Sequence, residues 1–248
     1  MKRVKASAGC INVEVPLPMA VMYPVAHNGE IAAADSPLIV ISHGNGGSHL
    51  GYRTLADYLA RHGFVVAMPE HPRNNRNNNE LAGTAENLEN RPRHLRRAID
   101  WMFTSEQFGS RLRSNMVAIV GHSLGGFTAL ALAGGLPTAF GHETPDNQPR
   151  PISVEPDPRV KALVLLVPAT AWFMNPGALR GVNVPILDRG TRLLDTAIPR
   201  RSGQSRSPRE RVGRTPSRGR RRTFCFPQSV SASDAKPGVR SVTGPAWL

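Results

Sequence analysis

Residues Met116–Ala133 read MVAIVGHSLGGFTALALA, and this stretch decides the fold. It opens with an apolar, β-branched run typical of a buried strand, passes through G-H-S-L-G-G, and ends in good helix formers. A strand, a tight G-x-S-x-G turn and a helix are the context of a nucleophile elbow. Such a sharp turn strains the backbone of its serine, and neighbouring side chains would clash unless they are absent. Ser123 is therefore the candidate nucleophile, beside a helix N-terminus that favours developing negative charge. The alternative is a structural turn whose serine has no chemical role.

Strand and helix patterns alternate on both sides of this stretch. Strands that alternate with helices imply a mostly parallel sheet with right-handed crossovers, flanked by helices. Residues 69–84 are polar and asparagine-rich and are predicted to be a loop, and residues 135–158 form a proline-rich excursion that is a candidate cap over the site. We predict strands within Val13–Tyr23, at Leu38–Ile41, Phe64–Met68 and Val160–Val167, and from Val184 onward, and helices at Tyr52–Arg61 and Arg91–Phe103.

Charge is distributed unevenly along the 248 residues. Residues 1–186 hold 17 basic and 14 acidic side chains, whereas residues 187–248 hold 14 basic and 4 acidic ones. The latter segment is rich in Arg, Ser, Pro and Gly and lacks apolar periodicity, and Val239–Leu248 shows neither a strand nor a helix pattern. We therefore predict a core over residues 1–187 and an incomplete or disordered segment over residues 188–248.

Targeting and membrane signals are weak throughout the chain. Two cysteines specify no disulfide framework, and no apolar leader follows the basic residues near the N-terminus, so we predict a cytoplasmic protein. The longest apolar run, Ala162–Met174, is interrupted by Pro168 and is too short to span a membrane.

A glycine-rich loop, His43–Gly47, follows the predicted strand Leu38–Ile41. Acyl transfer creates an oxyanion that preorganised backbone N–H groups must bind. One donor comes from the residue after the nucleophile, which is Leu124, and the second from such an earlier loop. We assign the second donor to Asn45; the alternative is a phosphate-binding loop or a plain turn.

The acid and the base of a triad are harder to assign. The order along the chain should be Ser, then Asp or Glu, then His. Asp195 follows the last predicted strand and is the candidate orienting acid, with Asp188 as its rival. None of the eight histidines lies beyond His142, which we expect at the surface. The other histidines considered are His122, the variable elbow position, and His71 and His94, which precede the elbow.

Several motifs in series resemble one family. His43–Gly47, Pro69–Pro72 with its asparagines, Asn90–Pro92 and Gly121–Gly126 occur in the order seen in bacterial α/β-hydrolases of the dienelactone hydrolase type, similar to platelet-activating factor acetylhydrolases. The resemblance covers about Val13 to Leu187. It implies an α/β-hydrolase fold, a Ser-Asp-His triad, hydrolysis of short acyl esters or lactones, and neither a cofactor nor a metal. Ser123 would then be the nucleophile, with Leu124 and Asn45 in the oxyanion hole.

The chain departs from this family near Leu187 to Pro199. Members of the family continue to a Gly-His followed by aromatic residues, and here the sequence is arginine-rich without histidine. We hypothesise that these residues are translated out of the ancestral reading frame. Two alternatives to a small-ester hydrolase remain open. One is a catalytically inactive hydrolase-like protein. The other is a nucleic-acid binder with a basic tail, although the arginine-rich segment lacks the interleaved aromatic residues typical of such binders.

Overall fold

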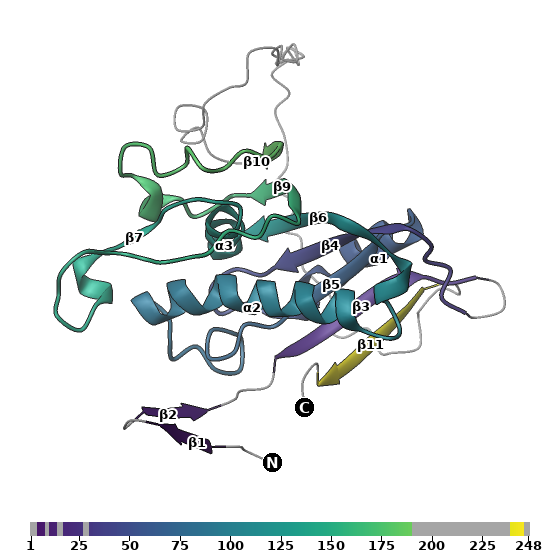
Figure 1. Cartoon of the computed structure of the whole chain (residues 1–248), viewed down its shortest axis with the longest axis horizontal. Helices are drawn as coiled ribbons and strands as arrows, with labels where there is room; N and C mark the ends of the chain where they lie inside the picture. Colours follow the sequence, from purple (N-terminus) through teal and green to yellow (C-terminus); the bar gives the residue numbers. More distant parts are fainter. Residues whose placement is uncertain (1–3, 8–9, 14–16, 27–29, 190–238, 246–248) are drawn as a thin grey trace, which may run out of the picture.

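A seven-stranded sheet organises the computed structural model, which describes residues 4–7, 10–13, 17–26, 30–189 and 239–245 (Figure 1). The strand order is β10-β9-β6-β4-β5-β3-β11. The five strands from β10 to β5 are parallel, and β3 and β11 join antiparallel at one edge. The sheet comprises β3 (Pro18–Pro24), β4 (Ser36–Ser42), β5 (Val65–Pro69), β6 (Leu112–His122), β9 (Val160–Leu166), β10 (Ile186–Arg189) and β11 (Val239–Pro245).

Helices cover both faces of this sheet. α1 (Arg53–Arg61) lies on one face, and α2 (Ala85–Thr104) and α3 (Leu124–Leu132) lie on the other (Figure 1). The mostly parallel sheet between helices confirms the predicted fold class. Smaller elements are the pairs β1 (Val4–Ser7) with β2 (Cys10–Val13) and β7 (Thr138–Ala139) with β8 (Arg150–Pro151), and the 3₁₀ turns η1 (His49–Tyr52), η2 (Gly109–Arg111), η3 (Gly141–Glu143) and η4 (Ala171–Phe173).

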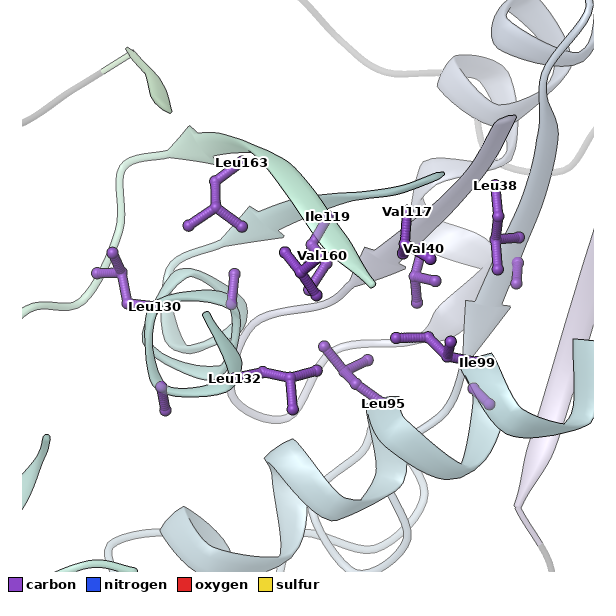
Figure 2. Close-up of a cluster of buried hydrophobic side chains, with 14 of the residues drawn as sticks. Leu38, Val40, Leu95, Ile99, Val117, Ile119, Leu130, Leu132, Val160 and Leu163 are labelled. Carbon is purple, nitrogen blue, oxygen red and sulfur yellow. The ribbon is translucent and has the colours of Figure 1, made fainter. Parts of the chain in front are cut away.

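Alternation along β4 produces two apolar cores. Leu38 and Val40 belong to the core under α2 and α3, whereas Ile39 and Ile41 belong to the core under α1. Because both faces of β4 are buried, neither face needs polar side chains, and this explains the continuous apolar run in its sequence. Figure 2 shows the first core, in which Leu95 and Ile99 of α2 point toward the strands.

Helix α2 begins earlier than the sequence pattern predicted. It starts at Ala85, and the Thr84 hydroxyl caps it by accepting a hydrogen bond from the Asn87 N–H at 3.2 Å. The predicted start at Arg91 was therefore wrong. Pro92, which follows the predicted start, lies inside the helix. Proline lacks an N–H and disfavours a helical residue before it, so the sequence pattern resembled a boundary there.

The expectation that Val239–Leu248 contains no strand was also wrong. β11 runs antiparallel to β3, with Val242 opposite Val21. An edge strand such as β3 offers a row of backbone N–H and C=O groups, and pairing through them requires no distinctive side-chain pattern. Residues 190–238, which include most of the arginine-rich segment, lie outside the described residues. In the part of the chain that the structure describes, no helix combines the length and apolarity needed to cross a membrane.

Candidate active site

Ser123 sits at the junction between β6 and α3. Its backbone has φ 51° and ψ −116°, whereas β6 ends at His122 and α3 begins at Leu124. A positive φ is uncommon in residues other than glycine and marks a backbone held in place by its surroundings. The strained serine conformation expected from the G-x-S-x-G motif is therefore present.

The glycines of the motif are required by close backbone contacts. A Cβ on Gly121 would stand 2.4 Å from the Gly125 oxygen, and a Cβ on Gly125 would stand 2.0 Å from the Ser42 oxygen. A Cβ on Gly126 would stand 2.5 Å from the Cβ of Pro168. These distances are far below van der Waals contact, so the turn can pack against β4 and the loop after β9 only without side chains.

Backbone hydrogen bonds hold the serine in this position. The Ser123 N–H donates to the Leu166 carbonyl at 3.0 Å. The Ser123 carbonyl accepts from the N–H of Gly126 at 2.8 Å and of Ala169 at 2.9 Å. The nucleophile candidate is thus fixed by α3 on one side and by β9 with its following loop on the other.

The glycine-rich loop after β4 packs directly on this turn. A Cβ on Gly44 would stand 3.3 Å from the Ser123 Cβ and 3.1 Å from the His122 Nδ1. Asn45 follows in the same loop, and Leu124 is the first residue of α3. The structure therefore brings together the segments of three predicted site residues, Ser123, Leu124 and Asn45.

Asp195, the fourth predicted site residue, lies outside the described residues. Its rival Asp188 belongs to β10, opposite Leu165 of β9, and not to a loop after the strand. β10 extends two residues past Leu187, so Asp188 is a strand residue and its role as the alternative acid stays a prediction.

The histidines of the described residues make contacts away from the Ser123 hydroxyl. His142 is exposed, as expected, and stacks on Phe140 with ring centroids 5.6 Å apart. His122 lies against Tyr52, with centroids 5.9 Å apart. Among the described residues, no imidazole hydrogen-bonds to Ser123, so the general base stays unassigned.

Three other histidines form a network beneath the site. The backbone N–H of His71 donates to His43 Nε2 at 3.1 Å, so His43 carries its proton on Nδ1 and donates it to the Gly44 carbonyl at 2.8 Å. His71 bonds Ser42 through Nε2 at 2.9 Å and His94 through Nδ1 at 3.3 Å. Because His43 Nε2 accepts a hydrogen bond, the His43 ring is neutral, and the His71–His94 bond requires that one of its two Nδ1 atoms is unprotonated.

Burial explains why these imidazoles stay neutral. Burial first, and then the Arg91 charge, lowers the pKa of His43 to about 4 and that of His94 to about 3. The same two causes hold the pKa of His71 well below its usual value. The network is thus uncharged at neutral pH and serves to fix the loop at Ser42–Gly44.

Arg91, a fully buried residue of α2 that donates to the His43 carbonyl of the glycine-rich loop, was not among the predicted site residues. The motif Asn90–Pro92 was recognised, but nothing in it distinguishes a buried arginine from a solvated one. The available signal was the asparagine-rich run at residues 74–79, whose first two members, Asn74 and Asn75, are buried and hydrogen-bonded.

A model of the alpha/beta hydrolase fold family matches residues 37–200. The chain belongs to this family. Cutinase est1 of Thermobifida alba is 30% identical over 163 residues, which are 65% of this chain and 43% of that protein. Cutinase 2 of Thermobifida cellulosilytica is 29% identical over 181 residues, which are 72% of this chain and 53% of that protein. The chain thus spans about half the length of the curated relatives that it matches.

Two solved esterase structures are similar to part of this chain. A ferulic acid esterase from Streptomyces cinnamoneus is 24% identical, with a TM-score of 0.47, over 65% of this chain and 44% of that one. Esterase 2 of Thermogutta terrifontis, in its apo form, is 17% identical, with a TM-score of 0.39, over 68% of this chain and 55% of that one.

Proposed function

We propose that this chain is a serine hydrolase of carboxylic esters in which Ser123 is the nucleophile. The observation that carries the proposal is the strained Ser123 backbone between β6 and α3, packed against Gly44 of the preceding glycine-rich loop. The similarity to cutinases supports ester hydrolysis as the reaction class.

In the proposed reaction, Ser123 Oγ attacks the ester carbonyl carbon. The carbonyl oxygen becomes an oxyanion that accepts hydrogen bonds from the N–H groups of Asn45 and Leu124. A base takes the Ser123 hydroxyl proton and gives it to the leaving alkoxide, and the acyl group remains on Ser123 until water releases it as the carboxylic acid. Asp195 stays our candidate for the acid that orients the base.

Short acyl esters and lactones are the proposed substrates. This substrate class is proposed from the resemblance to the dienelactone hydrolase and acetylhydrolase type. The family match by itself supports only the alpha/beta hydrolase fold. p-Nitrophenyl acetate, butyrate and palmitate, compared with an aliphatic lactone, test this preference. A higher kcat/KM for palmitate than for acetate would contradict it.

Serine phosphonylation tests the nucleophile directly. A fluorophosphonate probe should add one phosphonyl group to the protein as fluoride leaves, and Ser123→Ala should abolish both this mass shift and p-nitrophenyl acetate hydrolysis. Ser105→Ala is the matched control, because Ser105 follows α2 as its C-cap and its hydroxyl accepts from the Gln107 N–H. Equal hydrolysis rates for the native protein and Ser123→Ala would overturn the proposal.

A catalytically inactive hydrolase-like protein is the second candidate. The observation in its favour is that no imidazole within the described ranges bonds Ser123. Background hydrolysis together with no phosphonyl labelling of the native protein would support it. The proposed change of reading frame is tested separately: one of the other two frames downstream of the Val184 codon should encode a strand-like segment followed by Gly-His.

A further inference from the structure

Arg91 is a fully buried cation behind the glycine-rich loop. It lies on α2, and its side chain is among the largest completely buried ones of the described residues. Nε donates to Thr128 Oγ1 at 3.0 Å, and one terminal nitrogen donates to Asn74 Oδ1. The other terminal nitrogen donates to the His43 carbonyl and, at 3.4 Å, to Ser42 Oγ.

All of these acceptors are neutral. None of the ion pairs in the described part of the chain includes Arg91. Burial lowers the pKa of Arg91 to about 9, so the guanidinium is charged at neutral pH. A buried charge without a carboxylate is costly and is tolerated when its hydrogen bonds are satisfied. Replacing buried ionic groups with well-packed apolar side chains is often neutral or stabilising, so stability alone does not account for this arginine.

Both residues proposed for the oxyanion hole are connected to this guanidinium through one side chain each. Asn74, which accepts from Arg91, donates through Nδ2 to Asn45 Oδ1 at 2.6 Å. Thr128, which also accepts from Arg91, donates to the Leu124 carbonyl at 2.9 Å. One planar group thus spans the glycine-rich loop and the first turn of α3, which are far apart in sequence.

We propose that Arg91 is the positioning residue of the oxyanion hole: its guanidinium fixes Asn45, through Asn74, relative to Leu124, through Thr128. The inference rests on the proposed esterase function. The planar fork is the feature that matters, because it presents donors in fixed directions to several acceptors at once. The guanidinium also holds its positive charge against the His43 carbonyl of the glycine-rich loop, and this charge favours an oxyanion bound by that loop.

Steady-state kinetics with p-nitrophenyl acetate on the full chain test this role. Arg91→Lys keeps the charge and loses the fork, and Thr128→Val keeps the volume and loses the hydroxyl link. Both should lower kcat about 10- to 100-fold with KM changed less than about threefold, because the oxyanion forms only after substrate has bound. Thr128→Ser restores the hydroxyl and should recover most of the lost kcat.

Arg159→Met is the matched control for lost stability. Arg159 forms ion pairs with Asp157 and with Asp100, which lies near the C-terminal end of α2. Losing these ion pairs weakens the fold without removing a contact to the glycine-rich loop. It should lower the melting temperature and leave kcat unchanged. The proposal is overturned if Arg91→Lys and Thr128→Val lower kcat no more than Arg159→Met does at temperatures where all variants are folded.

Amide hydrogen exchange separates this inference from the proposed function. Exchange in peptides covering residues 43–47 and 124–128 should become at least fivefold faster in Arg91→Lys than in the native protein, with β9 unchanged. If the native protein hydrolyses no ester, the proposed function fails, and faster exchange at residues 43–47 still supports Arg91 as the residue that fixes the loop. Unchanged exchange there overturns the inference whatever the activity.

Discussion

The main-chain oxygen of Ser42 lies where a side chain on Gly125 would have to go. A Cβ at Gly125 would stand 2.0 Å from this oxygen and 2.7 Å from the Ser42 carbonyl carbon. β4 and the first turn of α3 therefore touch backbone to backbone, and this contact determines how closely the glycine-rich loop approaches Ser123.

Gly125→Ala should break this contact. Because backbone and not a flexible side chain must move, we expect a loss of about 3 kcal/mol in the free energy of unfolding and loss of ester hydrolysis. Gly51→Ala is the control, since a Cβ there meets nothing within 4 Å. Urea denaturation measures both variants, and a similar small effect in each would contradict the close contact.

Asn45 should contribute to catalysis through its backbone. Asn45→Ala keeps the N–H and loses the side-chain bond from Asn74, so we expect kcat to fall about 10-fold, at the lower end of the loss expected for Arg91→Lys. Asn45→Pro removes the N–H and should lower kcat by about 10²- to 10³-fold. Initial rates with p-nitrophenyl acetate distinguish the two variants, and equal losses would show that Asn45 is not the backbone donor.

Acid should destabilise the protein through its buried histidines. The folded-state pKa of His43 is lowered to about 4, whereas an unfolded histidine titrates near ~6.5. The unfolded chain therefore binds more protons within this window, and the free energy of unfolding falls as the pH falls through it. Each such histidine adds a slope of about 1.4 kcal/mol per pH unit.

His71→Gln removes one of these titrating groups. The pKa of His71 is held well below its usual value by burial and by Arg91. Urea denaturation between about pH 5 and 7 should show a shallower pH dependence for His71→Gln than for the native protein. His62→Gln, at an exposed position, should keep the native slope, and identical slopes in the two variants would refute the prediction.

Val167 should be a site of stored backbone strain. It follows β9 with φ 47° and is 58% exposed, and a β-branched residue in this conformation costs about 1 kcal/mol or more. Val167→Asn should therefore raise the free energy of unfolding by about 1 kcal/mol. Leu187, 50% exposed in β10, provides the comparison: Leu187→Asn should be neutral or destabilising. A loss of stability in Val167→Asn would contradict the strain.

Local sequence was sufficient for the elements around the candidate site. The β-branched run before Gly121, the glycines of the turn and the helix formers after it predicted β6, the turn at Ser123 and α3. Sequence was insufficient where a residue broke a local rule for a tertiary reason. Pro92 inside α2 made the pattern resemble a helix boundary, so the start of the helix was predicted too late. Val239–Pro245 forms β11 because it pairs with the edge of β3.

The sequence by itself determined the α/β-hydrolase fold and the position of Ser123, because steric limits and apolar periodicity act between near neighbours. Only the tertiary structure decided that the loop at Gly44 lies on Ser123, and that Arg91 reaches Ser42, Asn74 and Thr128 at once. The physical reason is burial. A guanidinium acquires a specific role only when the fold removes it from water and leaves these few acceptors within reach.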